Sequence, residues 1–131
     1  MTRVRLLGMS LPEKDDQIVL LHNPRCSKSR AAKAMLEERS VDYVERLYLE
    51  DPLTLSELKD LGALLGRDAA AWMRTKEAAF SEAGLSGSST DEELLAAVSK
   101  FPILMERPIL MRGKRAAIGR PLEDIEALLD Q

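Results

Sequence analysis

The stretch Ile18-Val19-Leu20-Leu21-His22-Asn23-Pro24-Arg25-Cys26-Ser27-Lys28-Ser29-Arg30 decides the fold of this chain. It opens on a continuous apolar run rich in β-forming residues, which is typical of a buried central strand. Asn23-Pro24 then predicts a turn, and apolar residues recur at helical spacing from Ser27 to Arg39. The stretch therefore predicts a strand, a tight loop and a helix that begins directly after Cys26.

The rest of the chain extends this unit to a complete fold. A second strand over 41–49 predicts a parallel βαβ unit with a right-handed crossover. Helices are expected over 54–65, about 68–80 and 90–100, and strands over 108–111 and 115–118 predict a β-hairpin, followed by a helix over 122–129. This order predicts an α/β fold with a thioredoxin-like, four-stranded mixed sheet and a helical insertion between its βαβ and ββα halves.

The first sixteen residues show no clear hydrophobic period. They contain Pro12 and the charged run Glu13-Lys14-Asp15-Asp16. We therefore expect residues 1–16 to form a flexible extension outside the fold, and residues 17–131 to form a single domain.

Composition excludes several classes of function. The 131 residues include one cysteine and one histidine, so an intrachain disulfide and a metal site built from several cysteines or histidines are excluded. The net charge of −3 gives no general attraction for nucleic acid or for an anionic membrane. No apolar run approaches the roughly 20 residues that cross a bilayer, and no export signal is evident. We expect a cytoplasmic protein without a bound metal.

Cys26 lies in a loop that favours a reactive thiolate. A lone cysteine is commonly a small buried apolar residue, but this one stands at a predicted helix start among Arg25, Lys28 and Arg30, with no acidic residue nearby. Exposed N–H groups and positive charges lower a thiol pKa. His22, four residues earlier, is either a partner of the sulfur or of a bound anion, or an ordinary hydrogen-bonded strand end.

The spacing around Cys26 excludes two familiar thiol loops. A phosphatase-type loop has an arginine six residues after the cysteine, where this chain has Ala32. A thioredoxin-type loop has a second cysteine three residues on, where this chain has Ser29. Cys26 thus lacks an internal resolving thiol, and the second thiol must come from another molecule.

A second cluster of cations lies over 107–120, which contains five basic and no acidic residues. Those within the hairpin are explained by solubility at a surface. Arg107 and Arg120 differ because each precedes a proline at a strand end, and a planar guanidinium binds tetrahedral oxyanions in a bidentate way. Arg74 is a weaker candidate, which local sequence predicts to be a solvated helix residue.

These motifs together resemble the glutaredoxin-dependent arsenate reductase family, and most closely its chromosomal branch. The resemblance runs from about residue 17 to the end of the chain. The motifs that carry it are His22-Asn23-Pro24-Arg25-Cys26-Ser27-Lys28-Ser29-Arg30, Leu47-Tyr48-Leu49-Glu50, Met73-Arg74, Pro102-Ile103-Leu104-Met105-Glu106-Arg107-Pro108-Ile109 and Ile118-Gly119-Arg120-Pro121.

The resemblance implies roles for these residues. Cys26 matches the nucleophile, and His22 and Ser29 match residues that activate or orient its thiolate. Three arginines, Arg74, Arg107 and Arg120, match the oxyanion-binding set, and Asn23 is expected to contact the substrate. The resemblance also implies a cis peptide bond at Arg107–Pro108, with Pro108 in a structural role.

The implied activity is the reduction of arsenate, or a similar oxyanion, through a single cysteine. Glutathione is then a co-substrate and glutaredoxin a partner, with no tightly bound cofactor. Three alternatives stay open: a glutathione-linked thiol oxidoreductase with another substrate, a redox regulator of the related family that binds RNA polymerase, and a family member without activity. Members of that regulator family generally carry the second cysteine that Ser29 replaces here.

Overall fold

The computed structural model describes residues 2–4, 12 and 16–131 of the chain. It divides into two compact units, one formed by Met1–Asp51 with Arg107–Gln131 and the other by Pro52–Glu106. The second unit coincides with the helical insertion expected from the sequence. No helix in the described part of the chain has the length and apolar character needed to cross a membrane. The expected single domain over 17–131 stays a prediction.

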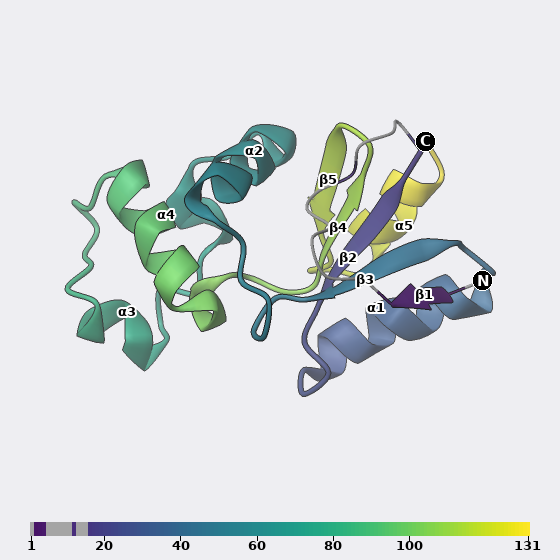
Figure 1. Cartoon of the computed structure of the whole chain (residues 1–131), viewed down its shortest axis with the longest axis horizontal. Helices are drawn as coiled ribbons and strands as arrows, with labels where there is room; N and C mark the ends of the chain where they lie inside the picture. Colours follow the sequence, from purple (N-terminus) through teal and green to yellow (C-terminus); the bar gives the residue numbers. More distant parts are fainter. Residues whose placement is uncertain (1, 5–11, 13–15) are drawn as a thin grey trace. The chain divides into compact units, whose positions relative to one another are not determined.

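The first unit is built on a mixed β-sheet (Figure 1). Its strands are β1 (Thr2–Val4), β2 (Ile18–His22), β3 (Tyr43–Leu47), β4 (Ile109–Arg112) and β5 (Arg115–Ile118), in the order β1-β3-β2-β4-β5. Strand β2 pairs in parallel with β3 and antiparallel with β4, which in turn pairs antiparallel with β5. The expected thioredoxin-like mixed sheet over β2 to β5 is confirmed.

The sheet has one strand more than expected. Residues Thr2–Val4 form β1, which pairs in parallel with β3 from Thr2 opposite Tyr43 to Val4 opposite Glu45. The expectation that the whole of 1–16 lies outside the fold is therefore wrong for these three residues. An edge of β3 offers unpaired backbone groups that even a short segment can satisfy, and three residues are too few to show a period. The remainder of the expected extension lies outside the described residues, apart from Pro12 and Asp16.

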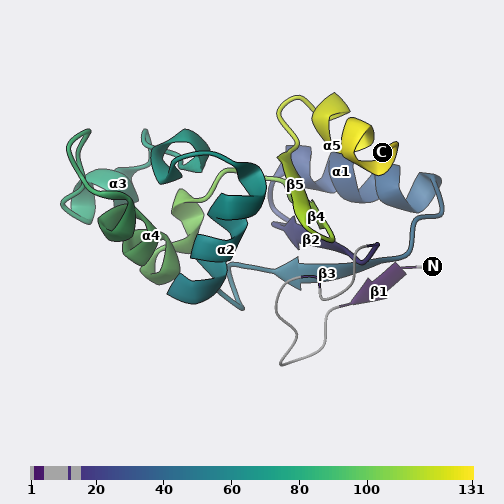
Figure 2. The same cartoon turned by 90° about the horizontal axis from the view of Figure 1, so that it is seen from above.

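Two helices cover one face of the sheet (Figure 2). Helix α1 (Ser27–Glu38) follows β2, and helix α5 (Glu123–Leu129) follows β5. Their buried residues and those of the sheet form one apolar core. Because α1 packs on this core, its first residue is held in a fixed position relative to the strand ends. The core contains Ile18, Leu20, Ala32, Leu36, Tyr43, Leu110, Ile125 and Leu128.

The second unit is helical. It contains α2 (Leu55–Leu65), the 3₁₀ helix η1 (Ala69–Trp72), α3 (Ala78–Glu82), α4 (Asp91–Lys100) and the 3₁₀ helix η2 (Pro102–Leu104). Thr54 and Thr90 form capping boxes at the starts of α2 and α4, and Gly66 ends α2 in the left-handed conformation. The helices expected over 54–65 and 90–100 are confirmed, each beginning one residue later than expected.

The helix expected over 68–80 is wrong. Met73 has extended backbone angles and forms an isolated antiparallel bridge with Met105. The Arg74 N–H donates to the Leu104 carbonyl at 2.6 Å, and the Glu106 N–H donates to the Trp72 carbonyl at 3.0 Å. These long-range bonds replace the helical ladder, so η1 and α3 are separate and Arg74 does not lie on a helix.

The hairpin returns the chain to the sheet edge where β2 ends. Gly113 adopts φ 57° in the two-residue turn between β4 and β5. The expected cis peptide bond at Arg107–Pro108 is confirmed, and a second one, not expected, precedes Pro121. The Gly119 N–H donates to the Pro108 carbonyl at 2.8 Å, so the two proline segments lie side by side.

We predict that Gly119→Ala destabilises the first unit. A Cβ at Gly119 would lie 2.6 Å from Ile125 Cδ1 and 2.8 Å from Pro108 Cγ, and overpacking of this kind costs about 1–3 kcal/mol. Chemical denaturation measures the free energy of unfolding. Gly87→Ala is the control, because a Cβ there meets nothing within 4 Å. Equal stability of the two variants would contradict the prediction.

Candidate active site

The loop between β2 and α1 is held by its own backbone and by Asn23. The Cys26 N–H donates to the Asn23 carbonyl at 3.0 Å, and the Arg25 N–H donates to Asn23 Oδ1 at 3.0 Å. Arg30 Nη1 donates to the Pro24 carbonyl at 2.8 Å. Asn23 is buried, so its side chain shapes the loop. Its expected contact with a substrate stays a prediction.

Cys26 occupies the position immediately before α1. Its backbone is extended, at φ −99° and ψ 122°, while its carbonyl already accepts the Arg30 N–H at 2.9 Å. The first turn of α1 contains no acidic residue. At such a position the first N–H groups of a helix have no partner within the helix and favour a negative charge. The sulfur therefore sits where the helix itself stabilises a thiolate.

The pKa of the Cys26 thiol is lower than that of an ordinary cysteine. Burial raises it, since only 8% of the residue is exposed. The backbone N–H of Ser29, the Arg107 side chain and the backbone N–H of Lys28 lower it and outweigh burial. A lowered pKa increases the thiolate fraction at neutral pH, and the thiolate is the nucleophilic form.

Arg107 is the cation that reaches the sulfur. Nε and Nη1 of its guanidinium are buried and have no hydrogen-bond partner among the described residues. Buried donors without partners are rare because each costs the free energy of its lost hydration. An oxyanion bound beside Cys26 would supply the missing acceptor oxygens, in the bidentate geometry that a guanidinium favours.

His22 and Ser29 are brought together beneath the loop. His22 Nδ1 lies 2.7 Å from Ser29 Oγ, and the Asn23 N–H donates to the same hydroxyl oxygen at 3.0 Å. Burial lowers the pKa of His22, as do Lys33 and Arg30, against the opposing effect of Glu45. The imidazole is therefore neutral at pH 7. Ser29 thus acts on Cys26 through its backbone N–H, while its hydroxyl is engaged with His22 and Asn23.

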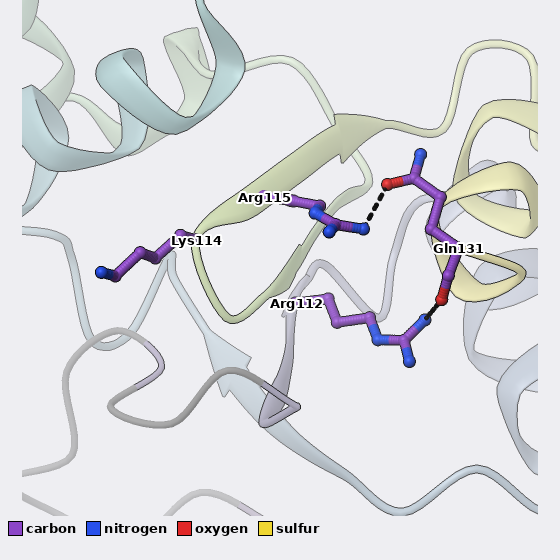
Figure 3. A pocket seen from close by; sticks show the side chains of 4 residues that line it. All are labelled: Arg112, Lys114, Arg115 and Gln131. Carbon is purple, nitrogen blue, oxygen red and sulfur yellow. Dashed lines mark hydrogen bonds between the residues drawn. The ribbon is translucent and has the colours of Figure 1, made fainter.

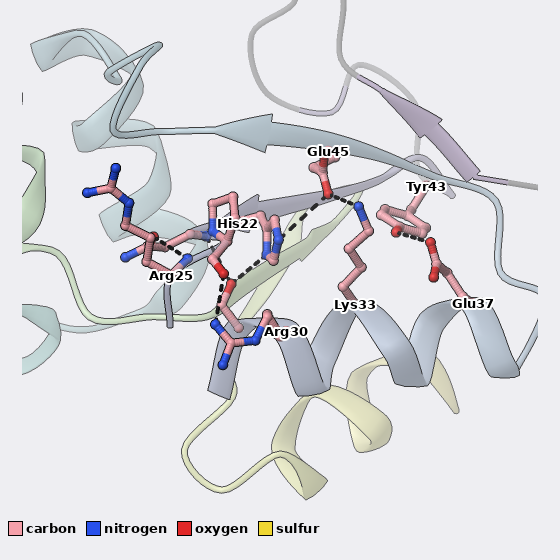
Figure 4. Close-up of polar contacts among 10 residues, drawn as sticks. His22, Arg25, Arg30, Lys33, Glu37, Tyr43 and Glu45 are labelled. Carbon is pink, nitrogen blue, oxygen red and sulfur yellow. Dashed lines mark hydrogen bonds and ion pairs between the residues drawn. The ribbon is translucent and has the colours of Figure 1, made fainter. Parts of the chain in front are cut away.

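Glu45 is a buried carboxylate beneath this pair that sequence reasoning missed. Its Oε1 accepts a hydrogen bond from Lys33 Nζ at 2.6 Å and lies 3.8 Å from His22 Nε2. Figure 4 shows Lys33 and His22 both directed at it. A carboxylate beside Nε2 favours the hydrogen on that nitrogen, so Nδ1 accepts the Ser29 hydroxyl. The available signal was the charged pair Glu45-Arg46 within the strand expected over 41–49.

The other two expected arginines have protein partners. Arg120 Nε donates to the Arg107 carbonyl at 2.7 Å, which places Arg120 beside the residue that reaches Cys26. Arg74 belongs to the second unit, where its Nη2 lies 3.1 Å from Glu77 Oε2 and its Nε lies 3.8 Å from Glu106 Oε1. The oxyanion-binding roles of both arginines stay predictions.

The hairpin cations form a separate cavity of about 390 Å³ (Figure 3). Arg112 Nη1 donates to the Leu129 carbonyl at 2.7 Å and to the Gln131 carbonyl at 3.1 Å, while Arg115 Nη1 donates to Gln131 Oε1 at 2.7 Å. Arg112 therefore satisfies backbone carbonyls at the end of α5. Two of the three hairpin cations bind their own chain.

We predict that Arg107→Gln raises the pKa of Cys26. The substitution removes the positive charge and donors that favour the thiolate while leaving the N–H groups of α1 in place. The pH dependence of alkylation by iodoacetamide measures the thiol pKa. Arg25→Gln is the control, because Arg25 is exposed and its substitution leaves Arg107 intact. An alkylation midpoint unchanged by Arg107→Gln would show that Arg107 does not act on the sulfur.

We predict that Glu45→Gln lowers the pKa of His22 further. The Glu45 carboxylate raises that pKa, and without it burial and the cations Lys33 and Arg30 act unopposed. An NMR titration reports His22 without ambiguity, because it is the chain's one histidine. Glu37→Gln, on the exposed side of α1, should leave the titration unchanged. A rise in the His22 midpoint in Glu45→Gln would exclude the proposed contact.

Comparisons with known proteins agree with this geometry. A model of the ArsC family matches residues 21–128. An arsenate reductase from Neisseria meningitidis serogroup A is 48% identical over 115 residues, which cover 86% of this chain and 98% of that protein. The global transcriptional regulator Spx from Streptococcus pneumoniae strain R6 is 33% identical over 113 residues, which cover 86% of this chain and 85% of that protein.

A solved structure resembles the chain over a similar length. The arsenate reductase from Vibrio cholerae superposes with a TM-score of 0.79 at 37% identity, covering 86% of this chain and 98% of its own. The family model spans most of the sequence, including the Cys26 loop and the two proline segments. The chain belongs to the ArsC family.

Proposed function

We propose that this protein reduces arsenate to arsenite with Cys26 as its single nucleophile, and with glutathione and glutaredoxin as the source of electrons. The observation that carries the proposal is the position of Arg107: its side chain acts on a thiol of lowered pKa, and its Nε and Nη1 are buried without a hydrogen-bond partner among the described residues. A nucleophile and an oxyanion-binding guanidinium together suit attack on a tetrahedral oxyanion. The 48% identity to a protein named arsenate reductase supports arsenate as that oxyanion.

The first two steps are condensations without a change in oxidation state. The Cys26 thiolate attacks arsenic(V), a sulfur–arsenic bond forms and one oxygen leaves as water. The thiol of glutathione then displaces a second oxygen as water, so arsenic carries both sulfurs. Arg107 neutralises the oxyanion and stabilises the charge that develops as the oxygens leave.

The third step transfers the electrons. A glutaredoxin thiolate attacks the glutathione sulfur, and the sulfur–arsenic bond breaks with its electron pair left on arsenic, which becomes arsenic(III). A mixed disulfide of glutaredoxin and glutathione leaves, and a second glutathione reduces it to give glutathione disulfide. Water then hydrolyses the Cys26–arsenic bond, which releases arsenite and restores the thiol.

The sequence explains why the reaction needs a thiol from another molecule. Cys26 is the chain's one cysteine, so an intramolecular disulfide does not form and the reducing equivalents come from other molecules. Glutathione and glutaredoxin work in a reducing compartment, and we accordingly place the reaction in the cytoplasm. In this scheme His22, Ser29 and Asn23 hold the thiolate loop in shape, and Arg120 adds positive charge for the oxyanion. The oxyanion-binding role that the family resemblance implies for Arg74, in the second unit, stays a prediction.

A second candidate is a redox regulator that binds RNA polymerase. It is favoured by the 33% identity to the regulator Spx, and disfavoured by Ser29, which stands where such regulators generally carry a second cysteine. A glutathione-linked thiol exchange on another substrate is the third. Co-purification with RNA polymerase would favour the regulator, and glutathionylation of Cys26 without arsenite production would favour thiol exchange.

We predict that Cys26→Ser abolishes arsenite formation in an assay with purified glutathione and glutaredoxin, with a loss of roughly a thousandfold or more.

In the same assay, Arg107→Gln should raise the KM for arsenate and lower kcat/KM by about a hundredfold, because it removes a guanidinium that contacts the reacting oxyanion. Arg25→Gln should stay within a few-fold of the parent, since Arg25 is exposed. Arsenate reduction retained by Cys26→Ser would refute the proposed function.

A further inference from the structure

A second cavity adjoins the Cys26 site within the first unit. It has a volume of about 400 Å³ and lies between the exposed start of α1 and the segment that enters α5. This size accommodates a small peptide rather than an inorganic anion alone. The lining residues are Lys28, Ala31, Gly119, Arg120, Pro121, Leu122 and Glu123.

The charges in this cavity are two cations and one anion. Lys28 and Arg120 supply the positive charges and Glu123 the negative charge. Lys28 and Glu123 are exposed, and neither forms an ion pair with a described residue. Arg120 uses Nε to bind the Arg107 carbonyl, which fixes its side chain beside the site.

Two residues that line the cavity, Lys28 and Arg120, are linked to groups that act on the Cys26 sulfur. On the helix side, the backbone N–H of Lys28 is one of the groups that lower the pKa of Cys26. On the proline side, Arg120 binds the backbone of Arg107, whose guanidinium also acts on Cys26. A molecule in the cavity therefore contacts one residue whose backbone N–H acts on the sulfur and one residue that is hydrogen-bonded to Arg107.

We propose that this cavity binds the thiol co-substrate, a tripeptide thiol with two carboxylates and one ammonium group, which is the charge pattern of glutathione. Lys28 and Arg120 pair with the carboxylates, with Arg120 shared between the tripeptide and the oxyanion, and Glu123 pairs with the ammonium. The pairing leaves the thiol of the tripeptide next to Cys26. The inference rests on the proposed function, because it assigns a binding site to the co-substrate of that reaction.

The neighbouring cavity on the other side of the loop fits this ligand less well. It measures about 290 Å³ and is lined by Arg25, Glu50 and residues of the β2 end and the segment after β3. It offers one exposed cation and one exposed anion, which leaves one carboxylate of the tripeptide without a partner. The cavity beside Lys28 and Glu123 matches all three charges.

The test measures how fast glutathione disulfide modifies Cys26, followed by mass spectrometry. The Cys26 thiolate attacks one sulfur of the disulfide, a Cys26–glutathione disulfide forms, and one glutathione thiolate leaves. The same rate is measured with bis(2-hydroxyethyl) disulfide, which carries no charge and reports the intrinsic reactivity of the thiolate. The ratio of the two rates isolates recognition of the charged groups, and it requires no arsenate.

Glu123→Gln should lower this ratio by roughly two- to fivefold, the effect of losing one exposed ion pair. The direction of the change in this ratio decides between two explanations, because glutathione disulfide carries a net negative charge. Loss of a negative charge would accelerate its reaction through general electrostatics alone, whereas loss of the ammonium partner slows it. Asp124→Asn removes the same charge from the next, exposed residue, which does not line the cavity, and should not lower the ratio.

Lys28→Gln should lower the ratio by a similar factor. An unchanged or higher ratio in Glu123→Gln would overturn the proposal, and so would an equal decrease in Asp124→Asn. The outcome is separate from that of the arsenate assay. A protein that forms no arsenite but shows the expected Glu123 effect would refute the proposed function and leave this binding site in place.

Discussion

The Cys26 sulfur lies between the first N–H groups of α1 and the guanidinium of Arg107, and burial opposes its ionisation. These groups come from opposite ends of the chain, and the sheet brings them together. Leu21 in β2 pairs with Ile109 in β4, so the loop that follows β2 faces the segment that precedes β4. A shift of one residue in this antiparallel register would exchange the faces of β4 and move Arg107 away from the sulfur. The reactivity of the thiol thus depends on strand pairing.

The buried network behind the loop explains why the helix start keeps its shape. Leu20 in β2 pairs with Glu45 in β3, which sets a carboxylate next to His22. A buried charge is costly unless it is paired, and Lys33 from α1 provides the partner. The network therefore connects β2, β3 and α1 through polar groups as well as through the apolar core. Ser29 is held by the same contacts, which leaves its backbone N–H available to the sulfur.

Local chemistry made much of the fold predictable. The helices expected over 54–65 and 90–100 are confirmed, because the groups that begin and end them, the capping boxes at Thr54 and Thr90 and the left-handed Gly66, act within a few residues of sequence. The helix expected over 68–80 fails because the bridge between Met73 and Met105 depends on a segment some thirty residues away. The cations of the loop around Cys26, on which the sequence-based prediction of a lowered pKa relied, explain that pKa only in part. Arg107 acts directly on the sulfur, whereas Arg30 binds the Pro24 carbonyl.

The three arginines implied by the family resemblance differ in what binding an anion requires of each. Nε and Nη1 of Arg107 are buried and have no hydrogen-bond partner among the described residues, so an oxyanion that reaches these two nitrogens would add hydrogen bonds there. Arg74 already faces the carboxylates of Glu77 and Glu106, and an anion that recruits it must compete with them. Arg120 has Nε engaged by a carbonyl of its own chain. Unmade hydrogen bonds to buried charged groups cost more than exposed ion pairs gain, so an oxyanion bound in the proposed way would gain most from Arg107. Oxyanion binding by Arg74 and Arg120 stays a prediction, and each of them would have to share or give up the contacts that it already makes.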